Sequence, residues 1–196
     1  MWNAERRFQG QSDIPLDETG QAQADRAARL LAALRPDLIV SSDLSRAAAT
    51  AAPLARLTGL EVILDKDLRE RQGGAWEGLN DAEIRARFPD QHTTWDPPDG
   101  ELSNAVADRV AAALRRVAVA LAEQVNAPDA LAVVVSHGAA IRLGMSRVLG
   151  LPDELFGLLG PLSNCSWSVV GTRYGDWRLL EHNAGTLPEP VLSDDR

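Results

Sequence analysis

The sequence is poor in the residues that build disulfide frameworks, metal–thiolate clusters and membrane spans. Its 196 residues include a single cysteine, Cys165, which excludes an intramolecular disulfide and a cluster of cysteine ligands. No apolar run approaches the roughly 18 residues that a membrane-spanning helix needs, and the residues that follow Met1 show no signal-peptide pattern. We therefore expect a cytoplasmic protein.

Positive charge is also scarce, because 20 Lys and Arg residues face 28 Asp and Glu residues and leave a formal charge of -8. Such an acidic balance argues against nucleic acid and against a membrane surface as the main partner. Hydrophobic residues make up 45% and charged residues 24%, which is ordinary for a globular protein. We predict one domain over residues 1–196, and we expect the acidic residues 189–196 to form a mobile tail.

Short β-branched runs alternate with longer segments of helical periodicity, a pattern typical of an α/β fold. The predicted strands are residues 37–41, 60–64, 132–136, 165–171 and 176–181. The predicted helices are residues 19–33, 43–57, 81–88, 103–125 and 139–149. We expect the last two strands to form a hairpin. The third strand is apolar on both faces, which predicts a buried strand of a parallel sheet.

Residues at the predicted helix ends support these assignments. Asp43 and Ser103 are suitable N-caps, and Gly59 and Gly150 lie just past two helix ends. Long loops of a compact domain usually serve in binding or catalysis. Two polar stretches are predicted to be such irregular loops, 65–80 and 89–102.

Three residues near predicted strand ends could bind an anion or transfer a proton, because ligands of open α/β sheets bind where strands end. Arg46 lies beside the start of a helix, where a cation is unfavourable unless an anion separates the two. Taken alone, it is better explained as a surface arginine paired with Asp43. His137 follows the third predicted strand and is either structural or functional. Glu70 is either a buried general acid or a solvated loop carboxylate.

Other kinds of site are not indicated. His92 and His182 lie far from His137 in the sequence, and no histidine spacing typical of a metal site occurs. The sequence also contains no Walker motif, no Gly-x-Gly-x-x-Gly loop and no Gly-x-Ser-x-Gly elbow. We expect neither a metal nor a cofactor.

Several short motifs extend over nearly the whole chain in a characteristic order. They are Asn3-x3-Arg7-x-Gln9-Gly10, Ser42-Asp43-Leu44-x-Arg46, Leu68-Arg69-Glu70, Gly74-x-Trp76-Glu77-Gly78, Gly100-Glu101, Ser136-His137-Gly138 and Asn164-Cys165-Ser166. Together they resemble the histidine phosphatase superfamily, which includes the cofactor-dependent phosphoglycerate mutases. The resemblance implies a three-layer α/β/α domain with a mostly parallel sheet.

The resemblance also implies a role for each matching residue. Arg46 would clamp the phosphate, His137 would stabilise the transferring phosphoryl group, and Glu70 would protonate the leaving oxygen. Such groups suit a loose transition state that spreads charge over three phosphoryl oxygens. Residues that would contact phosphate or substrate are Asn3, Gln9, Gly10, Arg46 and Gly138. The implied activity is metal-independent hydrolysis of a small phosphorylated metabolite through a phosphohistidine.

One family motif, the Arg-His-Gly that carries the nucleophilic histidine, does not occur in the sequence. Family spacing would place this histidine about four residues before Met1, at the end of a central first strand. We expect that a chain starting at Met1 cannot form the phosphohistidine, and we favour a start site placed too late.

Two alternatives to a phosphatase stay open. They are a cofactor-dependent phosphoglycerate mutase, although mutases are generally longer, and a catalytically inactive truncated binding protein. A homodimer is also compatible with the resemblance. The segments 9–13 and 163–167 are similar to those of family members that act on glucosyl-3-phosphoglycerate.

Overall fold

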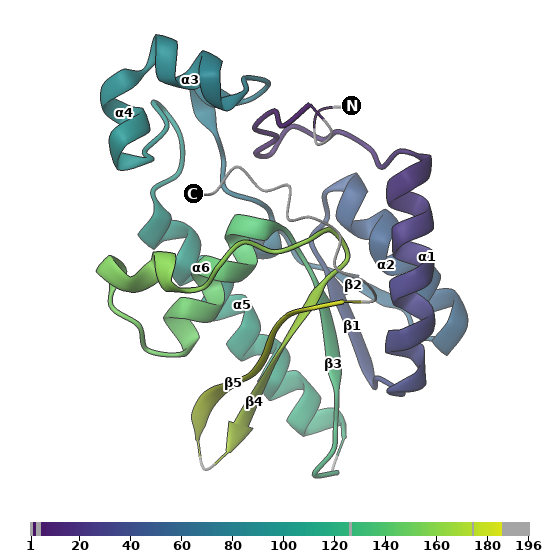
Figure 1. Cartoon of the computed structure of the whole chain (residues 1–196). Helices are drawn as coiled ribbons and strands as arrows, with labels where there is room; N and C mark the ends of the chain where they lie inside the picture. Colours follow the sequence, from purple (N-terminus) through teal and green to yellow (C-terminus); the bar gives the residue numbers. More distant parts are fainter. Residues whose placement is uncertain (1, 3–4, 126, 174, 186–196) are drawn as a thin grey trace.

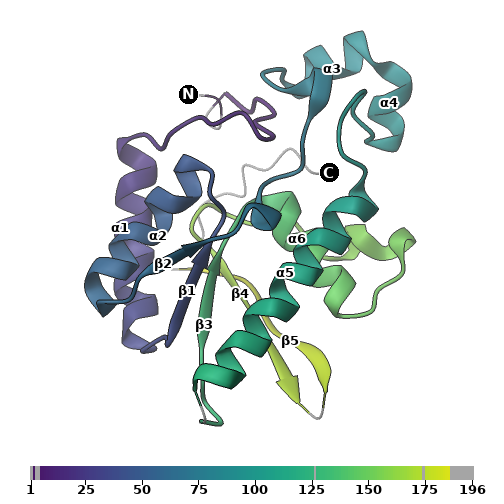
Figure 2. The same cartoon turned by 180° about the vertical axis from the view of Figure 1, so that it is seen from behind.

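A parallel sheet lies between two layers of helices (Figures 1 and 2). This computed structural model describes residues 2, 5–125, 127–173 and 175–185. The predicted tail at 189–196 therefore lies outside the described residues. The sheet has the order β2-β1-β3, and its strands are β1 (Leu38–Ser41), β2 (Val62–Leu64) and β3 (Ala132–Val135). The α/β/α prediction is confirmed.

The alternation of side chains along β1 explains the three layers, because successive residues of a strand point to opposite faces. Leu38 and Val40 belong to a core cluster with residues of α5 and α6. Ile39 belongs to a second cluster with residues of α1 and α2. The six helices in the described part of the chain are α1 (Glu18–Ala33), α2 (Ser45–Thr58), α3 (Asp81–Arg87), α4 (Pro89–Thr94), α5 (Ser103–Gln124) and α6 (Gly138–Val148).

The carboxyl ends of the three parallel strands meet at one edge of the sheet. Ser41 is aligned with Leu64 of β2 and with Val135 of β3. The segments that follow these strands are therefore brought together, as expected for a parallel sheet. The described part of the chain also contains three short 3-10 turns: η1 (Lys66–Leu68), η2 (Gly74–Trp76) and η3 (Asp153–Leu158).

The other two strands among the described residues form the predicted hairpin. They are β4 (Trp167–Arg173) and β5 (Asp176–Ala184), which pair antiparallel in a separate sheet. Consequently β3 pairs only with β1 among the described strands, and its four residues are half-buried. The predicted parallel pairing of β3 is confirmed, but its predicted full burial is wrong for the described part of the chain, because its other edge has no paired strand there.

Helix ends depart from the predictions in a few places. The N-caps of α2 and α5 are Leu44 and Leu102, so the predicted caps Asp43 and Ser103 are wrong. Gly59 does end α2 in a left-handed conformation, with φ of 76°, and Gly150 also has a φ of 76° just past α6.

The predicted irregular stretch 89–102 contains the short helix α4. Pro89 begins this helix, and proline is favoured at a first helical position because its fixed φ suits a helix and its missing N–H needs no partner there. Trp95 ends the helix in a left-handed conformation. Helices α3 and α4 lie above the carboxyl edge of the sheet (Figure 1).

Candidate active site

Three segments that follow the parallel strands converge at the carboxyl edge of the sheet. The Glu70 carboxylate accepts hydrogen bonds from the amides of Ala139 at 3.2 Å and Ala140 at 3.0 Å, in the first turn of α6. His137, directly before that turn, contacts Ser42 through an Nε2···Oγ distance of 2.9 Å. Arg46 lies in the first turn of α2, which follows Ser42, and it interacts electrostatically with both Glu70 and His137. The structure thus brings the three expected catalytic residues together.

The Glu70 carboxyl group is enclosed, although part of the residue's surface remains accessible. Burial raises the pKa of this carboxyl above the ordinary value of a glutamate, because the charged form loses its hydration. Amides of Arg71, Ala139 and Ala140 and the charge of Arg46 act in the opposite direction, but burial outweighs them. A carboxyl that keeps its proton closer to neutral pH is suited to general acid catalysis.

His137 is only 9% exposed. Burial, followed by the positive charges of Arg46 and Arg109, lowers the pKa of His137 to about 3. The imidazole is therefore neutral near pH 7, and it acts as a hydrogen-bonding group rather than as a cation. Ser42 contacts the ring, and its Oγ also accepts a hydrogen bond from the Leu44 amide at 3.3 Å.

The Arg46 guanidinium binds backbone carbonyls. It donates to the Gly10 carbonyl at 2.7 Å and to the Ser12 carbonyl at 2.8 Å. The expected pairing with Asp43 is wrong, because the Asp43 carboxylate binds Arg69 through two hydrogen bonds of 2.7 and 2.6 Å. Among the described residues no carboxylate forms an ion pair with Arg46, so its positive charge is held in place without being neutralised.

The loop that holds Arg46 is itself held by Glu77. This carboxylate accepts hydrogen bonds from the amides of Gln11 at 2.9 Å and Ser12 at 3.0 Å, and from the Ser12 hydroxyl. It also accepts from the Gly73 amide at 3.0 Å. Gly10 has a φ of 53°, and a Cβ there would collide with the Glu77 side chain. Only glycine suits this position.

The other residues expected to contact phosphate or substrate are Gly138, Gln9 and Asn3. Gly138 is the first residue of α6, and no described atom lies within 4 Å of the position that a Cβ would take, so the backbone there is open to a ligand. The Gln9 carbonyl accepts from the Ser12 amide at 3.1 Å, within the loop that holds Arg46. Asn3 lies outside the described residues.

The two remaining histidines lie outside this cluster, and not where they were expected. His92 was expected in a loop but lies in α4, where its Nε2 is 2.8 Å from the Asp81 carboxylate. His182 was expected after the last strand but lies within β5, where it contacts Ser168 at 3.0 Å. In the described part of the chain, no three His, Cys, Asp or Glu side chains are grouped to hold a metal ion.

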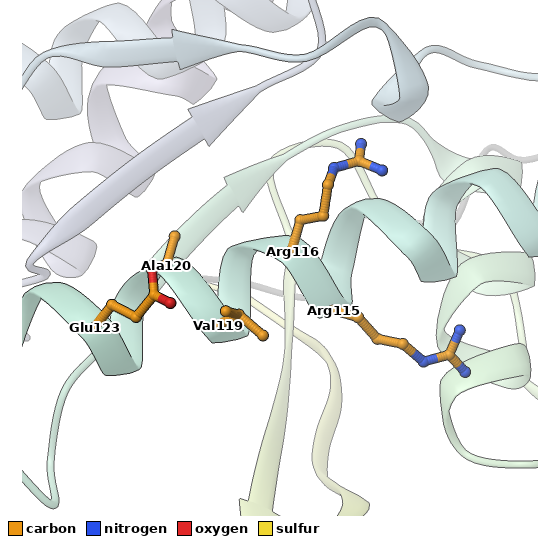
Figure 3. Close-up of a pocket in the computed structure, with 5 residues that line it drawn as sticks. All are labelled: Arg115, Arg116, Val119, Ala120 and Glu123. Carbon is orange, nitrogen blue, oxygen red and sulfur yellow. The ribbon is translucent and has the colours of Figure 1, made fainter.

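A shallow hollow elsewhere on the surface is not part of this cluster. It lies along α5 and is lined by Arg115, Arg116, Val119, Ala120 and Glu123 (Figure 3). Arg116 points from this helix toward the segment after β2, and Arg115 points away from that segment (Figure 3).

No described helix combines the length and the hydropathy that a bilayer span requires.

Three residues near the cluster received no role from the sequence: Ser42, Glu77 and Arg109. Two of them stand in the family motifs, but nothing local shows what they contact. A signal for Arg109 was present, since it lies one helical turn from Val106 and from Ala113, which are both fully buried. An arginine on the buried face of a helix indicates a specific partner.

The family model described as histidine phosphatase superfamily (branch 1) matches residues 1–185. The chain belongs to the histidine phosphatase superfamily. The resemblance that the motifs predicted is therefore confirmed.

Relatives of this histidine phosphatase superfamily member include phosphatases and mutases. A glucosyl-3-phosphoglycerate phosphatase of Mycobacterium tuberculosis is 38% identical over 199 residues, which cover 93% of this chain and 89% of that protein. A probable phosphoglycerate mutase of Enterobacter sp. is 38% identical over 185 residues, which cover 90% of this chain and 82% of that protein.

The fold is also similar to solved structures. A mycobacterial glucosyl-3-phosphoglycerate phosphatase in complex with VO3 superimposes with a TM-score of 0.89 at 36% identity, over 94% of both chains. A second structure of that enzyme, in complex with inorganic phosphate, gives a TM-score of 0.86 at 37% identity over 91% of both chains.

Proposed function

We propose that this chain forms the phosphate-binding and proton-transfer site of a phosphomonoester hydrolase that acts on small phosphorylated metabolites. The observation that carries the proposal is the convergence of Arg46, Glu70 and His137 at one edge of the sheet. Arg46 keeps its charge for an anion, and burial raises the pKa of Glu70, which favours the protonated form that gives a proton to a leaving oxygen. One relative with a similar fold, the mycobacterial phosphatase, has been solved in complex with VO3 and with inorganic phosphate, which supports an anion of this size.

The proposed reaction has two steps. A histidine nitrogen attacks phosphorus as the ester P–O bond breaks, and Glu70 gives its proton to the departing oxygen. Water then attacks the phosphohistidine, the Glu70 carboxylate takes the water's proton, and the P–N bond breaks to release phosphate. Arg46 and His137 stabilise the charge on the three phosphoryl oxygens, while Gln9, Gly10 and Gly138 contact the phosphate or the substrate.

The nucleophile of this reaction has to be a further histidine. His137 is buried against Ser42, and His92 and His182 lie on α4 and β5. The family resemblance assigns the nucleophile to an Arg-His-Gly motif, which does not occur in these 196 residues. The proposal therefore separates into anion binding and turnover. These 196 residues should bind phosphate only weakly, because the arginine of the Arg-His-Gly motif is missing, and turnover should depend on that motif.

Anion binding is tested with the 196-residue chain and inorganic phosphate. We expect phosphate to shift the NMR signals of the His137 ring and the Gly138 amide. Arg46→Ala should weaken this binding by about tenfold or more, because a charge-assisted contact is lost. Arg116→Ala is the matched control, since Arg116 is half exposed on α5 and outside the site. Equal binding by wild type and Arg46→Ala would contradict the proposal.

Turnover is tested by joining the same chain to an N-terminal strand that ends in Arg-His-Gly. We expect this form to release phosphate from p-nitrophenyl phosphate, and the 196-residue chain to release none. Glu70→Gln and His137→Ala should each reduce the rate by about 100-fold or more. A folded, phosphate-binding form that still hydrolyses no phosphomonoester would exclude the phosphatase and favour a binding protein.

For the substrate, we propose a phosphoglycerate ester such as glucosyl-3-phosphoglycerate, on which the mycobacterial relative acts by name. The active form should release phosphate from this ester faster than from 3-phosphoglycerate. Formation of 2-phosphoglycerate from 3-phosphoglycerate would instead identify a mutase. The homodimer, the cytoplasmic location and a single domain reaching residue 196 stay predictions.

A further inference from the structure

Arg109 on α5 uses its whole guanidinium to hold one backbone segment and one carboxylate. It donates to the carbonyls of Asp67 at 2.9 Å, Arg69 at 2.7 Å and Glu70 at 3.0 Å. It also binds the two carboxylate oxygens of Glu101 at 2.6 and 2.7 Å. All five N–H groups of the guanidinium therefore have an acceptor. The side chains of Arg109 and Glu101 are each only 19% exposed.

The three carbonyls depend on this guanidinium. None of them accepts a backbone hydrogen bond among the described contacts of the loops, and only the Glu70 carbonyl has a second donor, the Gln11 side chain at 3.0 Å. A buried carbonyl without a hydrogen-bond donor lowers the stability of the fold. The backbone path of residues 67–70 is therefore set by the position of the Arg109 guanidinium. A lysine has three donors on one nitrogen and cannot reproduce a planar fork of five.

We propose that Arg109, held by Glu101, is a positioning residue for the Glu70 carboxyl group. The catalytic meaning of this inference rests on the proposed function. Arg109 fixes the backbone of Glu70 from the side of α5, and the amides of Arg71, Ala139 and Ala140 fix its carboxylate. A general acid works only within hydrogen-bond reach of the oxygen that it protonates, so a displacement of about 1 Å lowers the rate.

Arg116 lies on the same helix as Arg109 and provides a comparison, because its partners in the described part of the chain are side chains only. It lies two turns beyond Arg109 and points toward the same segment (Figure 3). However, its bonds are to the side chains of Asp65 and Asp67, both at 2.8 Å, and it is 52% exposed. It binds no backbone group of a site residue among the described contacts. Arg116→Lys is therefore the matched control for Arg109→Lys.

The first experiment needs no turnover and uses the 196-residue chain. The titration of the Glu70 carboxyl is followed by carbon-13 NMR in wild type, Arg109→Lys, Glu101→Gln and Arg116→Lys, with Glu70→Gln to assign the signal. We expect Arg109→Lys to shift both the carboxyl signal and its titration midpoint, and Glu101→Gln to shift them in the same direction by less. Arg116→Lys should leave them unchanged. An unchanged Glu70 titration in folded Arg109→Lys and Glu101→Gln would overturn the proposal, whatever the outcome for phosphatase activity.

The second experiment uses the active form described above and compares two leaving groups. An alkyl phosphate such as 3-phosphoglycerate needs protonation of its leaving oxygen, whereas p-nitrophenyl phosphate needs little. We expect Arg109→Lys to lower kcat/KM for the alkyl ester by about tenfold or more and kcat/KM for p-nitrophenyl phosphate by less than about twofold. We compare kcat/KM because it excludes hydrolysis of the phosphohistidine, the step in which Glu70 serves both substrates alike. Equal losses with both substrates would show a general structural defect and overturn the positioning role. Glu101→Gln, which keeps the guanidinium, repeats the comparison in a milder variant.

Discussion

Two backbone regions carry the site, and they are held in opposite ways. Residues 67–70 present carbonyls to the Arg109 guanidinium, which projects from the 22-residue helix α5. Residues 9–12 present amides to the Glu77 carboxylate, which follows the three-residue turn η2. One region is thus tied to the central core by a donor, and the other is tied to a neighbouring loop by an acceptor.

This difference separates the two functions of the site. The Glu70 carboxyl is positioned by α5, whose residues Val106 and Val110 are part of the larger core cluster. The Arg46 guanidinium is positioned by the carbonyls of Gly10 and Ser12. The loop that carries these carbonyls is held by the Glu77 carboxylate of a neighbouring loop. Damage to the first support should therefore unfold the domain, whereas damage to the second should mainly loosen the hold on phosphate.

The largest effect is expected for Arg109→Ala. This change leaves Glu101 without its partner and three carbonyls without their donor, and removing one partner of a buried pair costs about 3–5 kcal/mol. The free energy of unfolding, measured with urea at pH 7, should fall by that amount. A loss below about 1 kcal/mol would contradict the proposed difference between the two regions, because it would show that Arg109 does not hold residues 67–70 to the core.

A smaller loss of stability is expected for Glu77→Ala, together with a clear loss of binding. The amides of Gln11, Ser12 and Gly73 lose their acceptor, but these loops can take up water, so we expect about 1–3 kcal/mol in unfolding free energy. Phosphate affinity, measured by NMR titration, should fall about tenfold because Arg46 loses its alignment. Glu123→Ala, at an exposed position of α5, is the control and should change neither quantity.

His137 lies between the two regions, since both Arg46 and Arg109 lower its pKa. Its folded pKa of about 3 is below the ordinary value of 6.5, so between these two values only the unfolded chain binds the proton. The stabilisation that comes with neutral His137 is therefore complete above pH 6.5 and is lost as the pH falls toward 3, by about 1.4 kcal/mol per pH unit.

The measurement is urea unfolding of wild type and His137→Gln between pH 7 and pH 5. The stability difference between the two chains should shrink as the pH falls, whereas the raised pKa of Glu70 acts oppositely and equally in both chains. A difference independent of pH would show that His137 is not held neutral by the two arginines and the surrounding core.

The smallest effect is expected for Arg116→Ala. Its ion pairs with Asp65 and Asp67 join the same segment to α5, but at an exposed position. Such surface pairs contribute little, so the unfolding free energy should change by no more than about 0.5 kcal/mol. A loss as large as that of Arg109→Ala would show that the side-chain ion pairs of Arg116 stabilise the domain as much as the backbone hydrogen bonds of Arg109.

Much of the fold could be predicted from the sequence because it depends on local patterns. The β-branched runs and the helical periodicities placed every named strand and five of the six described helices within a few residues. The exceptions have local physical reasons. The helix α4 was missed because it lies in a polar, proline-containing stretch, and the cap predicted for α2 was wrong because the Asp43 carboxylate binds Arg69.

The candidate site was predicted less completely. Arg46, Glu70 and His137 were identified because each stands next to a strand end or in a family motif. Their supports Ser42, Glu77 and Arg109 were not, because each acts on residues far away in the chain. Glu77, for example, binds Ser12, and no periodicity or spacing predicts that contact.

The sequence by itself determined the order of the elements and the segments at which the parallel strands end, since both follow from side-chain patterning over a few residues. Only the tertiary structure decided which partners the charged side chains take. Arg46 binds carbonyls instead of Asp43, and Arg109 reaches residues 67–70 from another layer. Hydrogen bonds between segments distant in the sequence depend on the packing of the helices against the sheet, and local preferences carry no information about that packing.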